Sequence, residues 1–256
     1  MEIERVNVLG VGISVLNLRT AVEAIAGAVK GRAKGYICVT GVHGVMEAQE
    51  SADFRHVLNR AFLNTPDGMP MVWMGKLRGK AAMSRVYGPD LMHEVFTWSR
   101  ESGCRHFFYG GQPGVAEELK RNMEAKYPGA VVCGVYTPPF RPLNADEEAA
   151  LIATMAKLRP DIIWVGLSTP KQERFMAEYL PKLDTALMVG VGAAFDFYAG
   201  RTRQAPRWIQ RSGFEWLYRL SQEPGRLWKR YLKNNPLFVM KIIGQLTGLR
   251  KYPLGS

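Results

Sequence analysis

A single carboxylate follows one of the short apolar runs of this sequence. The segment Thr65-Pro66-Asp67-Gly68-Met69-Pro70 puts Asp67 in a turn directly after the apolar residues 61–63. An Asp before Gly commonly bonds only to nearby backbone, so a purely structural turn is the alternative. A lone carboxylate at the end of a strand can also accept a proton from a substrate hydroxyl. Asp67 is therefore a candidate general base.

An arginine stands before the start of an expected helix in Arg85-Val86-Tyr87-Gly88-Pro89-Asp90-Leu91. Pro89 and Asp90 are typical first-turn residues of a helix. The planar guanidinium binds phosphate through two parallel hydrogen bonds. Arg85 is therefore a candidate phosphate ligand, and a surface ion pair with Asp90 is the structural alternative.

Glycines and polar side chains follow three further apolar runs. Glycine-rich turns between a strand and a helix let backbone N–H groups approach a phosphate. The patterns are neither G-x-G-x-x-G nor a P-loop, so they disfavour a dehydrogenase and indicate at most a nucleotide or phosphate site. A capped helix or a simple turn is the alternative for each segment. The candidate substrate-binding residues are Gly110, Gly111, Gln112, Gly114, Lys171, Gln172, Gly192 and Asp196.

No metal-binding pattern is evident. The four histidines have no paired spacing, and the sequence contains no D-x-D motif. We therefore expect no metal and no other cofactor, and we expect cationic side chains to replace a metal at any diphosphate. The three cysteines lie far apart, as is typical of reduced thiols in a cytosolic protein.

Apolar runs and amphipathic stretches alternate through the first 200 residues. This alternation predicts βαβ units, and thus an α/β, Rossmann-like, mostly parallel sheet with helices on both faces. Ligands of such sheets bind beyond the carboxyl ends of the strands. The expected strands are 6–16, 35–39, 105–109, 130–135, 161–167 and 186–191, and the expected helices are 18–29, 45–60, 115–126, 145–158 and 171–179.

Nearly all the surplus positive charge lies at the C-terminal end. Residues 201–256 carry 12 Lys and Arg against two acidic residues, Glu215 and Glu223, whereas residues 1–200 are close to neutral. The whole chain has a net charge of +11. A near-neutral body, 1–200, with a cationic tail, 201–256, indicates a protein that grips a polyanion: a phospholipid surface, a diphosphate or a nucleic acid.

The tail has the pattern of basic amphipathic helices with interfacial aromatic residues. Apolar residues recur at helical spacing over 214–220 and 227–232, interrupted by Pro224-Gly225, and a third apolar segment, 237–246, follows Pro236. Packing of these helices on the body, with a solvated basic face, is the structural alternative to membrane docking.

No apolar run reaches the roughly 18 residues that a membrane span needs. The first residues lack the basic and apolar regions of a signal peptide. We therefore expect a cytoplasmic protein that meets a membrane only from the side.

Taken in order, these segments resemble the WecG/TagA/CpsF glycosyltransferases (glycosyltransferase family 26). The resemblance also includes Glu215-Trp216-Leu217-Tyr218-Arg219-Leu220 and Glu223-Pro224-Gly225-Arg226-Leu227, and it runs from about Val6 to Leu232. It implies transfer of an N-acetylmannosamine-type sugar from a UDP-sugar donor to a polyprenyl-diphosphate-linked saccharide in cell-surface polysaccharide synthesis. It further implies inversion at the anomeric carbon, no metal, and peripheral attachment to the anionic inner face of the plasma membrane.

Roles for single residues also follow from the resemblance. Asp67 resembles the catalytic base, Arg85 and Gln172 resemble donor-contacting residues, and Arg219 and Arg226 match tail arginines that reach the diphosphate. One position departs from the family pattern, because Gly41 stands where a Thr-x-Asn cluster has its Asn. Thr40 therefore remains a catalytic candidate without that neighbour. A homo-oligomer is a further expectation from the resemblance.

Two interpretations from other classes remain open at this point. A basic nucleic-acid-binding protein fits the charge and the aromatic residues, but no known nucleic-acid-binding signature appears, and we expect no nucleic acid as partner. A non-catalytic membrane adaptor would use the tail alone. Neither alternative accounts for a carboxylate, glycines and arginines at successive strand ends.

Overall fold

The computed structural model describes residues 3–255, without the side chain of Arg226, and consists of two compact units. Unit 1 contains residues 1–17, 39–87 and 203–256, and unit 2 contains residues 18–38 and 88–202. The strands are β1 (Arg5–Val8), β2 (Val11–Ser14), β3 (Gly35–Thr40), β4 (Leu63–Pro66), β5 (Arg105–Gly110), β6 (Val131–Tyr136), β7 (Ile162–Gly166) and β8 (Leu187–Gly190).

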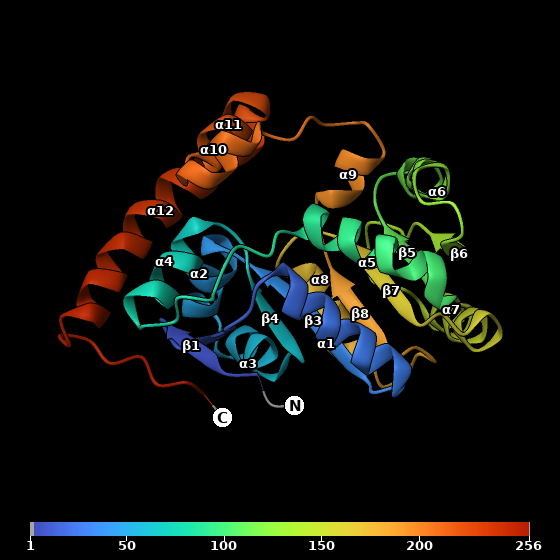
Figure 1. Cartoon of the computed structure of the whole chain (residues 1–256), viewed down its shortest axis with the longest axis horizontal. Coiled ribbons are helices and arrows are strands. Elements are labelled where there is room, and N and C mark those ends of the chain that lie inside the picture. The colour runs from blue at the N-terminus through green and yellow to red at the C-terminus, as the bar shows by residue number, and fades with distance from the viewer. Residues whose placement is uncertain (1–2, 256) are drawn as a thin grey trace. The chain divides into compact units, whose positions relative to one another are not determined.

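The helices alternate with the strands along most of the chain, and the last three follow one another in the tail (Figure 1). They are α1 (Leu18–Lys30), α2 (Val42–Glu50), α3 (Ala52–Arg60), α4 (Met69–Leu77), α5 (Gly88–Ser102), α6 (Val115–Lys126), α7 (Ala145–Leu158), α8 (Lys171–Tyr179), α9 (Ala194–Tyr198), α10 (Arg207–Ser212), α11 (Glu215–Gln222) and α12 (Pro224–Leu246).

The predicted parallel sheet is confirmed. Six strands are hydrogen-bonded in the order β4-β3-β8-β7-β5-β6, and the pairs β3–β8, β8–β7, β7–β5 and β5–β6 are parallel. In unit 2 the chain moves outward from β5 to β6 through α6, and then back to β7 and β8 through α7 and α8. Right-handed crossovers in opposite directions place α6 on one face and α7 and α8 on the other.

The core of unit 2 is aromatic and lies around β5 and β7. The ring of Phe96 from α5 stacks on His106 at 4.1 Å between centroids, and Phe108 meets Phe195 edge to face at 5.6 Å. The indole Nε1 of the fully buried Trp164 donates to His106 Nδ1 at 3.1 Å. Edge-to-face and offset pairs of this kind stabilise a core beyond the area that they bury.

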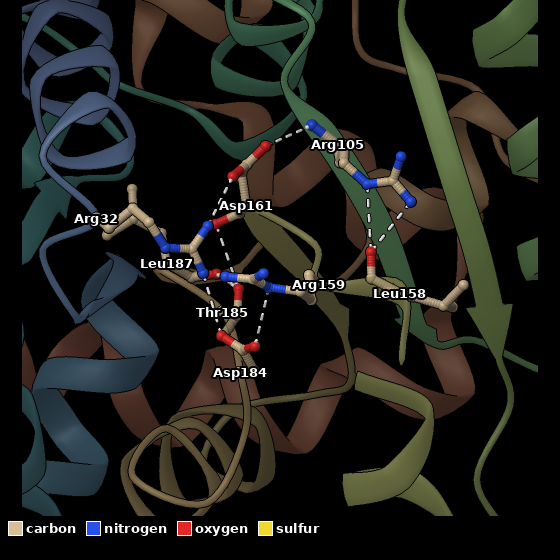
Figure 2. A network of polar contacts seen from close by, with 8 residues as sticks. All are labelled: Arg32, Arg105, Leu158, Arg159, Asp161, Asp184, Thr185 and Leu187. Atoms are coloured by element: carbon tan, nitrogen blue, oxygen red, sulfur yellow. Dashed lines mark hydrogen bonds and ion pairs between the residues drawn. The ribbon is translucent and has the colours of Figure 1, made fainter. Parts of the chain in front are cut away.

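A network of ion pairs and hydrogen bonds lies at the amino-terminal ends of β5, β7 and β8 (Figure 2). The Arg32 guanidinium lies 3.5 Å from the Asp161 carboxylate and 3.1 Å from that of Asp184, which Arg159 also approaches at 3.3 Å. The Arg105 backbone N–H donates to Asp161 Oδ2 at 2.8 Å. Because ligands of parallel sheets bind at the opposite, carboxyl ends, this network joins strand starts and does not mark the candidate site.

Strand structure over 6–16 is confirmed, but the segment is an antiparallel hairpin and not one continuous strand. β1 pairs with β2 from Arg5–Ser14 to Val8–Val11, and Leu9 and Gly10 form a two-residue turn with φ of 51° and 82°. Positive φ at both central residues is the geometry that matches the twist of the two strands. Leu is unusual in such a turn, which usually has Asn, Asp or Gly at this position. The sequence therefore gives no clear signal that the strand ends at Val8.

The expected helix over 45–60 is likewise two helices. Ser51 is extended, with φ of −136°, and its hydroxyl accepts from the Phe54 backbone N–H at 3.2 Å. A serine side chain that caps a new helix satisfies one of its unpaired N–H groups and favours a break. The separation between α2 and α3 is therefore a capping effect.

The tail is helical as expected, with one difference at Pro236. The break at Pro224 is confirmed between α11 and α12, but α12 continues through Pro236 to Leu246. Proline removes one backbone hydrogen bond, to the carbonyl four residues earlier. That carbonyl belongs to the exposed Leu232, where water can replace the lost donor.

Candidate active site

Asp67 lies at the carboxyl end of β4, as the sequence predicts. Its backbone N–H donates to the Thr40 carbonyl at the end of β3, at 3.0 Å. Gly68 follows with φ of 84°, and α4 begins at Met69. The Asp67 side chain is 31% exposed, so its carboxylate is accessible and is not part of the core.

Thr40 and Gly41 form the neighbouring strand end. Thr40 is buried, and its methyl group lies against Gly44, where a Cβ would stand 3.1 Å from it. A Cβ on Gly41 would stand 3.0 Å from the Asp67 carbonyl oxygen and 3.6 Å from its carboxylate. The missing side chain at position 41 therefore lets the Asp67 turn approach closely. A catalytic role for Thr40 stays a prediction.

Arg85 comes to the Asp67 carboxylate from the segment that precedes Gly88. Its Nη2 lies 3.8 Å from Asp67 Oδ1 and makes a short contact with Glu215 Oε2. Its Nη1 lies 3.2 Å from the side-chain oxygen of Gln210, and its guanidinium carbon lies 4.1 Å from the centre of the Tyr87 ring. With 12% of its side chain exposed, Arg85 is held in place and is not a surface cation.

The charges around Arg85 perturb two neighbouring groups. Burial raises the pKa of Glu215, and the charges of Arg85 and Arg219 partly oppose this rise. Burial also raises the pKa of Tyr87 well above its usual value, with Glu215 and Asp67 adding to the effect. A cluster of perturbed groups with an accessible carboxylate is typical of a functional site.

Two tail arginines were expected at this site. Burial alone would lower the pKa of Arg219 in α11, but Tyr231, Tyr87, Asp67 and Glu215 outweigh that effect and the pKa is raised. Arg219 therefore belongs to the same charged cluster as Asp67. Arg226 lies in α12, and its side chain lies outside the described part of the structure.

The sequence did not single out Glu215 and Gln210 as members of this cluster. Both contact Arg85 across more than 120 positions of sequence, a pairing that no local pattern reveals. One signal was present for Glu215, since it is one of two acidic residues among 12 cations in the tail.

The glycine-rich turn of unit 2 lies at the point where the strand order reverses. The chain leaves β5 in one direction and returns to β7 on the other side of it, and the Gly111 N–H donates to the Gly166 carbonyl at 3.0 Å. Gly110 has φ of 121°, and a Cβ there would stand 2.7 Å from that carbonyl oxygen. Such a reversal is where ligands bind in open parallel sheets.

The helix that follows this turn offers mixed electrostatics to an anion. Gly114, in the left-handed region, precedes α6, and no side chain caps the helix. The positive end of the helix dipole favours an anion, whereas Glu117 and Glu118 in the first turn repel one. Gln112 and Gly114 are exposed, so both can be reached by a ligand.

Gln172 is the most constrained of the candidate residues in unit 2. It is buried, and its Nε2 donates to Glu173 Oε1 at 2.9 Å, which also accepts from the Thr169 hydroxyl at 2.8 Å. Its Oε1 has no hydrogen-bond partner within residues 3–255 and faces Gly192, where a Cβ would stand 3.5 Å away. An unsatisfied buried acceptor is costly unless a ligand supplies a donor.

The remaining candidates of unit 2 lie at the ends of β7 and β8. Lys171 is exposed at the start of α8. Asp196 is half-buried in α9, and its backbone carbonyl accepts from the Arg201 N–H at 2.8 Å. Gly110, Gly111, Gln112, Gly114, Lys171, Gln172, Gly192 and Asp196 all belong to unit 2, whereas Asp67, Thr40, Arg85 and Arg219 belong to unit 1.

Comparison with known proteins gives two consistent results. The family model described as "Glycosyl transferase WecG/TagA/CpsF family" matches residues 6–252. An N-acetylglucosaminyldiphosphoundecaprenol N-acetyl-beta-D-mannosaminyltransferase from Bacillus subtilis (strain 168) is 30% identical over 185 residues, 72% of this chain and 70% of the relative. The enzyme of the same name from Bacillus spizizenii (strain W23) is 31% identical over 211 residues, 82% of this chain and 79% of the relative.

Proposed function

This chain belongs to the WecG/TagA/CpsF family of glycosyl transferases and is a glycosyltransferase, and from that premise we propose its substrates and mechanism. The donor is a UDP-linked sugar of the N-acetylmannosamine type. The acceptor is a saccharide linked through diphosphate to a polyprenol, at the inner face of the plasma membrane. Family membership favours this enzyme over a nucleic-acid-binding protein or a non-catalytic adaptor.

The observation that carries the proposal is the accessible Asp67 carboxylate beside the fixed Arg85 guanidinium. The acceptor hydroxyl, which is hardly ionised at neutral pH, attacks the anomeric carbon of the donor sugar. Its proton passes to Asp67 as the new C–O bond forms, and the bond from the anomeric carbon to the UDP oxygen breaks. A single displacement of this kind inverts the anomeric configuration.

The departing UDP gains negative charge, which the protein must stabilise. We propose that Arg85 and Arg219, with Arg226, supply positive charge in place of a metal ion. Preorganised donors directed at developing charge act without reorganisation during the reaction, and removing one typically costs about 10²–10³ in rate. The guanidinium of Arg85 is preorganised in this sense, because Gln210, Glu215 and Tyr87 hold it.

We further propose that the candidate residues of unit 2 bind the donor. The Gly114 N–H and the side chain of Gln112 contact its diphosphate, and the missing side chains of Gly110 and Gly111 let the diphosphate approach the turn, since the Gly111 N–H already donates to the Gly166 carbonyl. The open Oε1 of Gln172 accepts from a donor hydroxyl or amide near Gly192. Lys171 and Asp196 complete this set as charged contacts.

We propose that the tail attaches the enzyme to an anionic membrane. The helix α12 packs on α2, where Asn234 Nδ2 lies 3.2 Å from His43 Nδ1 (Figure 1). Its buried apolar residues are Leu227, Phe238 and Ile242. A second face of the same helix exposes an apolar stripe at helical spacing: Trp228, Leu232, Val239, Ile243 and Leu246. A helix with one apolar face already packed, and a second left exposed beside cations, is suited to lie at a lipid interface.

Other helices of unit 1 also expose large apolar side chains. Trp208, Phe214 and Leu217 are exposed on or next to α10 and α11, and Trp73 and Leu77 are exposed on α4. Trp73 also lies against Gly213, where a Cβ would stand 2.7 Å from its ring. No helix within residues 3–255 is both long and apolar enough to cross a bilayer. The body 1–200 and the tail 201–256 thus have the proposed roles of catalyst and membrane-docking segment.

A transfer assay tests the proposal. Radiolabelled UDP-N-acetylmannosamine and synthetic undecaprenyl-diphosphate-linked N-acetylglucosamine are incubated with the full chain in detergent, with and without EDTA. We expect a lipid-linked disaccharide with inverted anomeric configuration, formed at the same rate with and without EDTA. Activity only with another donor would overturn the assigned sugar, and loss of activity in EDTA would overturn metal independence.

A further inference from the structure

Glu215 is a buried acid in a basic segment. It begins α11, and its side chain is only 15% exposed although α11 has no fully buried residue. Removing a carboxylate from water is costly unless cations face it. Arg85 and Arg219 supply those cations. The position of Glu215 therefore depends on a specific pairing with the strand-end cluster of unit 1.

The pairing fixes the orientation of Arg85. Glu215 takes the short contact with Nη2, Gln210 lies 3.2 Å from Nη1, and the Tyr87 ring covers one face of the guanidinium. Gln210 and Glu215 both belong to the tail. Asp67 lies on the remaining side, at 3.8 Å, which is beyond hydrogen-bond distance.

Both carboxylates, of Glu215 and Asp67, attract the same Nη2 atom of Arg85. Without Glu215, Asp67 would be the nearest anion to the Arg85 guanidinium within residues 3–255, and the guanidinium would move toward it, because charge-assisted bonds are strongest at 2.7–2.9 Å. A direct Arg85–Asp67 bond would hold the Asp67 carboxylate in its charged form and occupy an oxygen needed for the incoming proton. The contact with Glu215 opposes the formation of this direct bond between Arg85 and Asp67.

We propose that Glu215 is a positioning residue, which holds Arg85 beside Asp67 without letting the two form a direct hydrogen bond. Docking of α11 then completes the site in unit 1. This inference rests on the proposed function, in which Asp67 accepts the proton and Arg85 stabilises the leaving group. In this role Glu215 acts through Arg85.

The test compares two variants, each of which replaces a glutamate that pairs with a cation by a neutral glutamine. Glu215→Gln keeps the shape and removes the charge. Glu50→Gln is the matched control, because Glu50 bonds Lys233 of the tail at 2.6 Å from an exposed position. We expect Glu215→Gln to lower kcat about tenfold or more, as for loss of a charge-assisted partner, and to move the acidic limb of the pH–rate profile to lower pH. Glu50→Gln should change neither.

A double-mutant cycle separates positioning from general support of the fold. If Glu215 acts through Arg85, Glu215→Gln should cost less than about twofold in an Arg85→Gln background. The inference would be overturned if the kcat losses of the two single variants multiplied in the double variant. A wild-type kcat and pH profile for Glu215→Gln would overturn it as well. If Glu215→Gln has a much lower Tm than the wild-type chain, Glu215→Asp is measured instead. The shorter Asp side chain cannot reach Arg85 in the same way, so a wild-type kcat in Glu215→Asp would contradict the inference.

The proposed function can fail separately. Full activity of Asp67→Asn would remove Asp67 as the base, whereas the cycle between Glu215 and Arg85 would still report whether the two residues act together.

Discussion

The Nη2 atom of Arg85 lies 3.8 Å from Oδ1 of Asp67, although the two residues are 18 positions apart and follow different elements. The arrangement depends on two backbone links at the carboxyl end of β4. The Val86 N–H donates to the Pro66 carbonyl at 2.9 Å, and the Thr65 hydroxyl donates to the Val86 carbonyl at 3.3 Å. These bonds hold the 85–87 segment beside the end of β4. Asp67 and Arg85 are therefore positioned by the same strand end.

Replacing Asp67 by Asn should abolish turnover and leave donor binding nearly intact. The amide keeps the shape of the side chain but cannot accept a proton at neutral pH, and general-base catalysis typically contributes about 10²–10⁴ in rate. Transfer is measured with labelled donor, and UDP binding by calorimetry. Asp53→Asn, at an exposed acid in the first turn of α3, is the control and should retain wild-type activity.

Much of the fold follows from local patterns, because β7 and β8 are continuous apolar runs, β5 and β6 are mostly apolar, and the helices between them have clear ends. The errors lie where a tertiary or side-chain effect overrides the pattern. The Leu9–Gly10 turn needs two positive φ values, Ser51 caps a new helix, and α12 continues through Pro236, whose missing N–H leaves only the carbonyl of the exposed Leu232 without its helical donor.

For the site, position along the chain was enough to select Asp67, since an acid after a strand lies at the ligand edge of a parallel sheet. The same logic selected the Gly110 turn, whereas Arg85 was selected as a phosphate-binding guanidinium just before an expected helix. It could not reveal Glu215 or Gln210, because their roles come from a contact across more than 120 residues. The isolated acid among the tail cations marked Glu215 as unusual, but nothing in the sequence connected it to Arg85.

Two exposed apolar residues of α12 should control membrane binding. Trp228 and Leu232 lie on the unpacked face of the helix, so a Trp228→Ser/Leu232→Ser variant should fold normally. Burying such side chains is worth about 1.5–3 kcal/mol each, so capture by anionic vesicles should fall by more than about tenfold. Flotation on phosphatidylglycerol vesicles is the measurement.

The control for that experiment is Phe140→Ser, because Phe140 is the most exposed aromatic residue of unit 2 and lies outside the tail. It should float like the wild-type chain. Equal capture of the α12 variant and the wild-type chain would contradict docking through this face.

Adding a methyl group at Gly110 should destabilise the fold. The residue has φ of 121°, and a Cβ would meet the Gly166 carbonyl oxygen at 2.7 Å. Strain at such a position costs about 1–3 kcal/mol before the clash is added. Gly114→Ala is the matched control, since its φ is also positive, at 82°, but no atom lies within 4 Å of the new Cβ. Urea unfolding should show a clearly larger loss for Gly110→Ala, and equal losses would show that the contact with Gly166 is unimportant.

Buried His106 should make the protein less stable in mild acid. Burial lowers the pKa of His106 to about 3, from an ordinary value of about 6.5. Well above pH 6.5 the residue is neutral in both the folded and the unfolded chain, so it adds no pH dependence. Below pH 6.5 the unfolded chain takes up a proton that folded His106 cannot, and the free energy of unfolding falls by about 1.4 kcal/mol per pH unit.

Between pH 6.5 and pH 5 this residue should therefore account for a loss of about 2 kcal/mol. His106→Gln keeps an acceptor for the Trp164 indole N–H but cannot be protonated, so its unfolding free energy should fall less steeply over this range. His56→Gln, at an exposed histidine, is the control and should keep the wild-type slope. Urea unfolding at half-unit steps of pH measures both. An unchanged slope in His106→Gln would mean that the folded protein accommodates the charged imidazole.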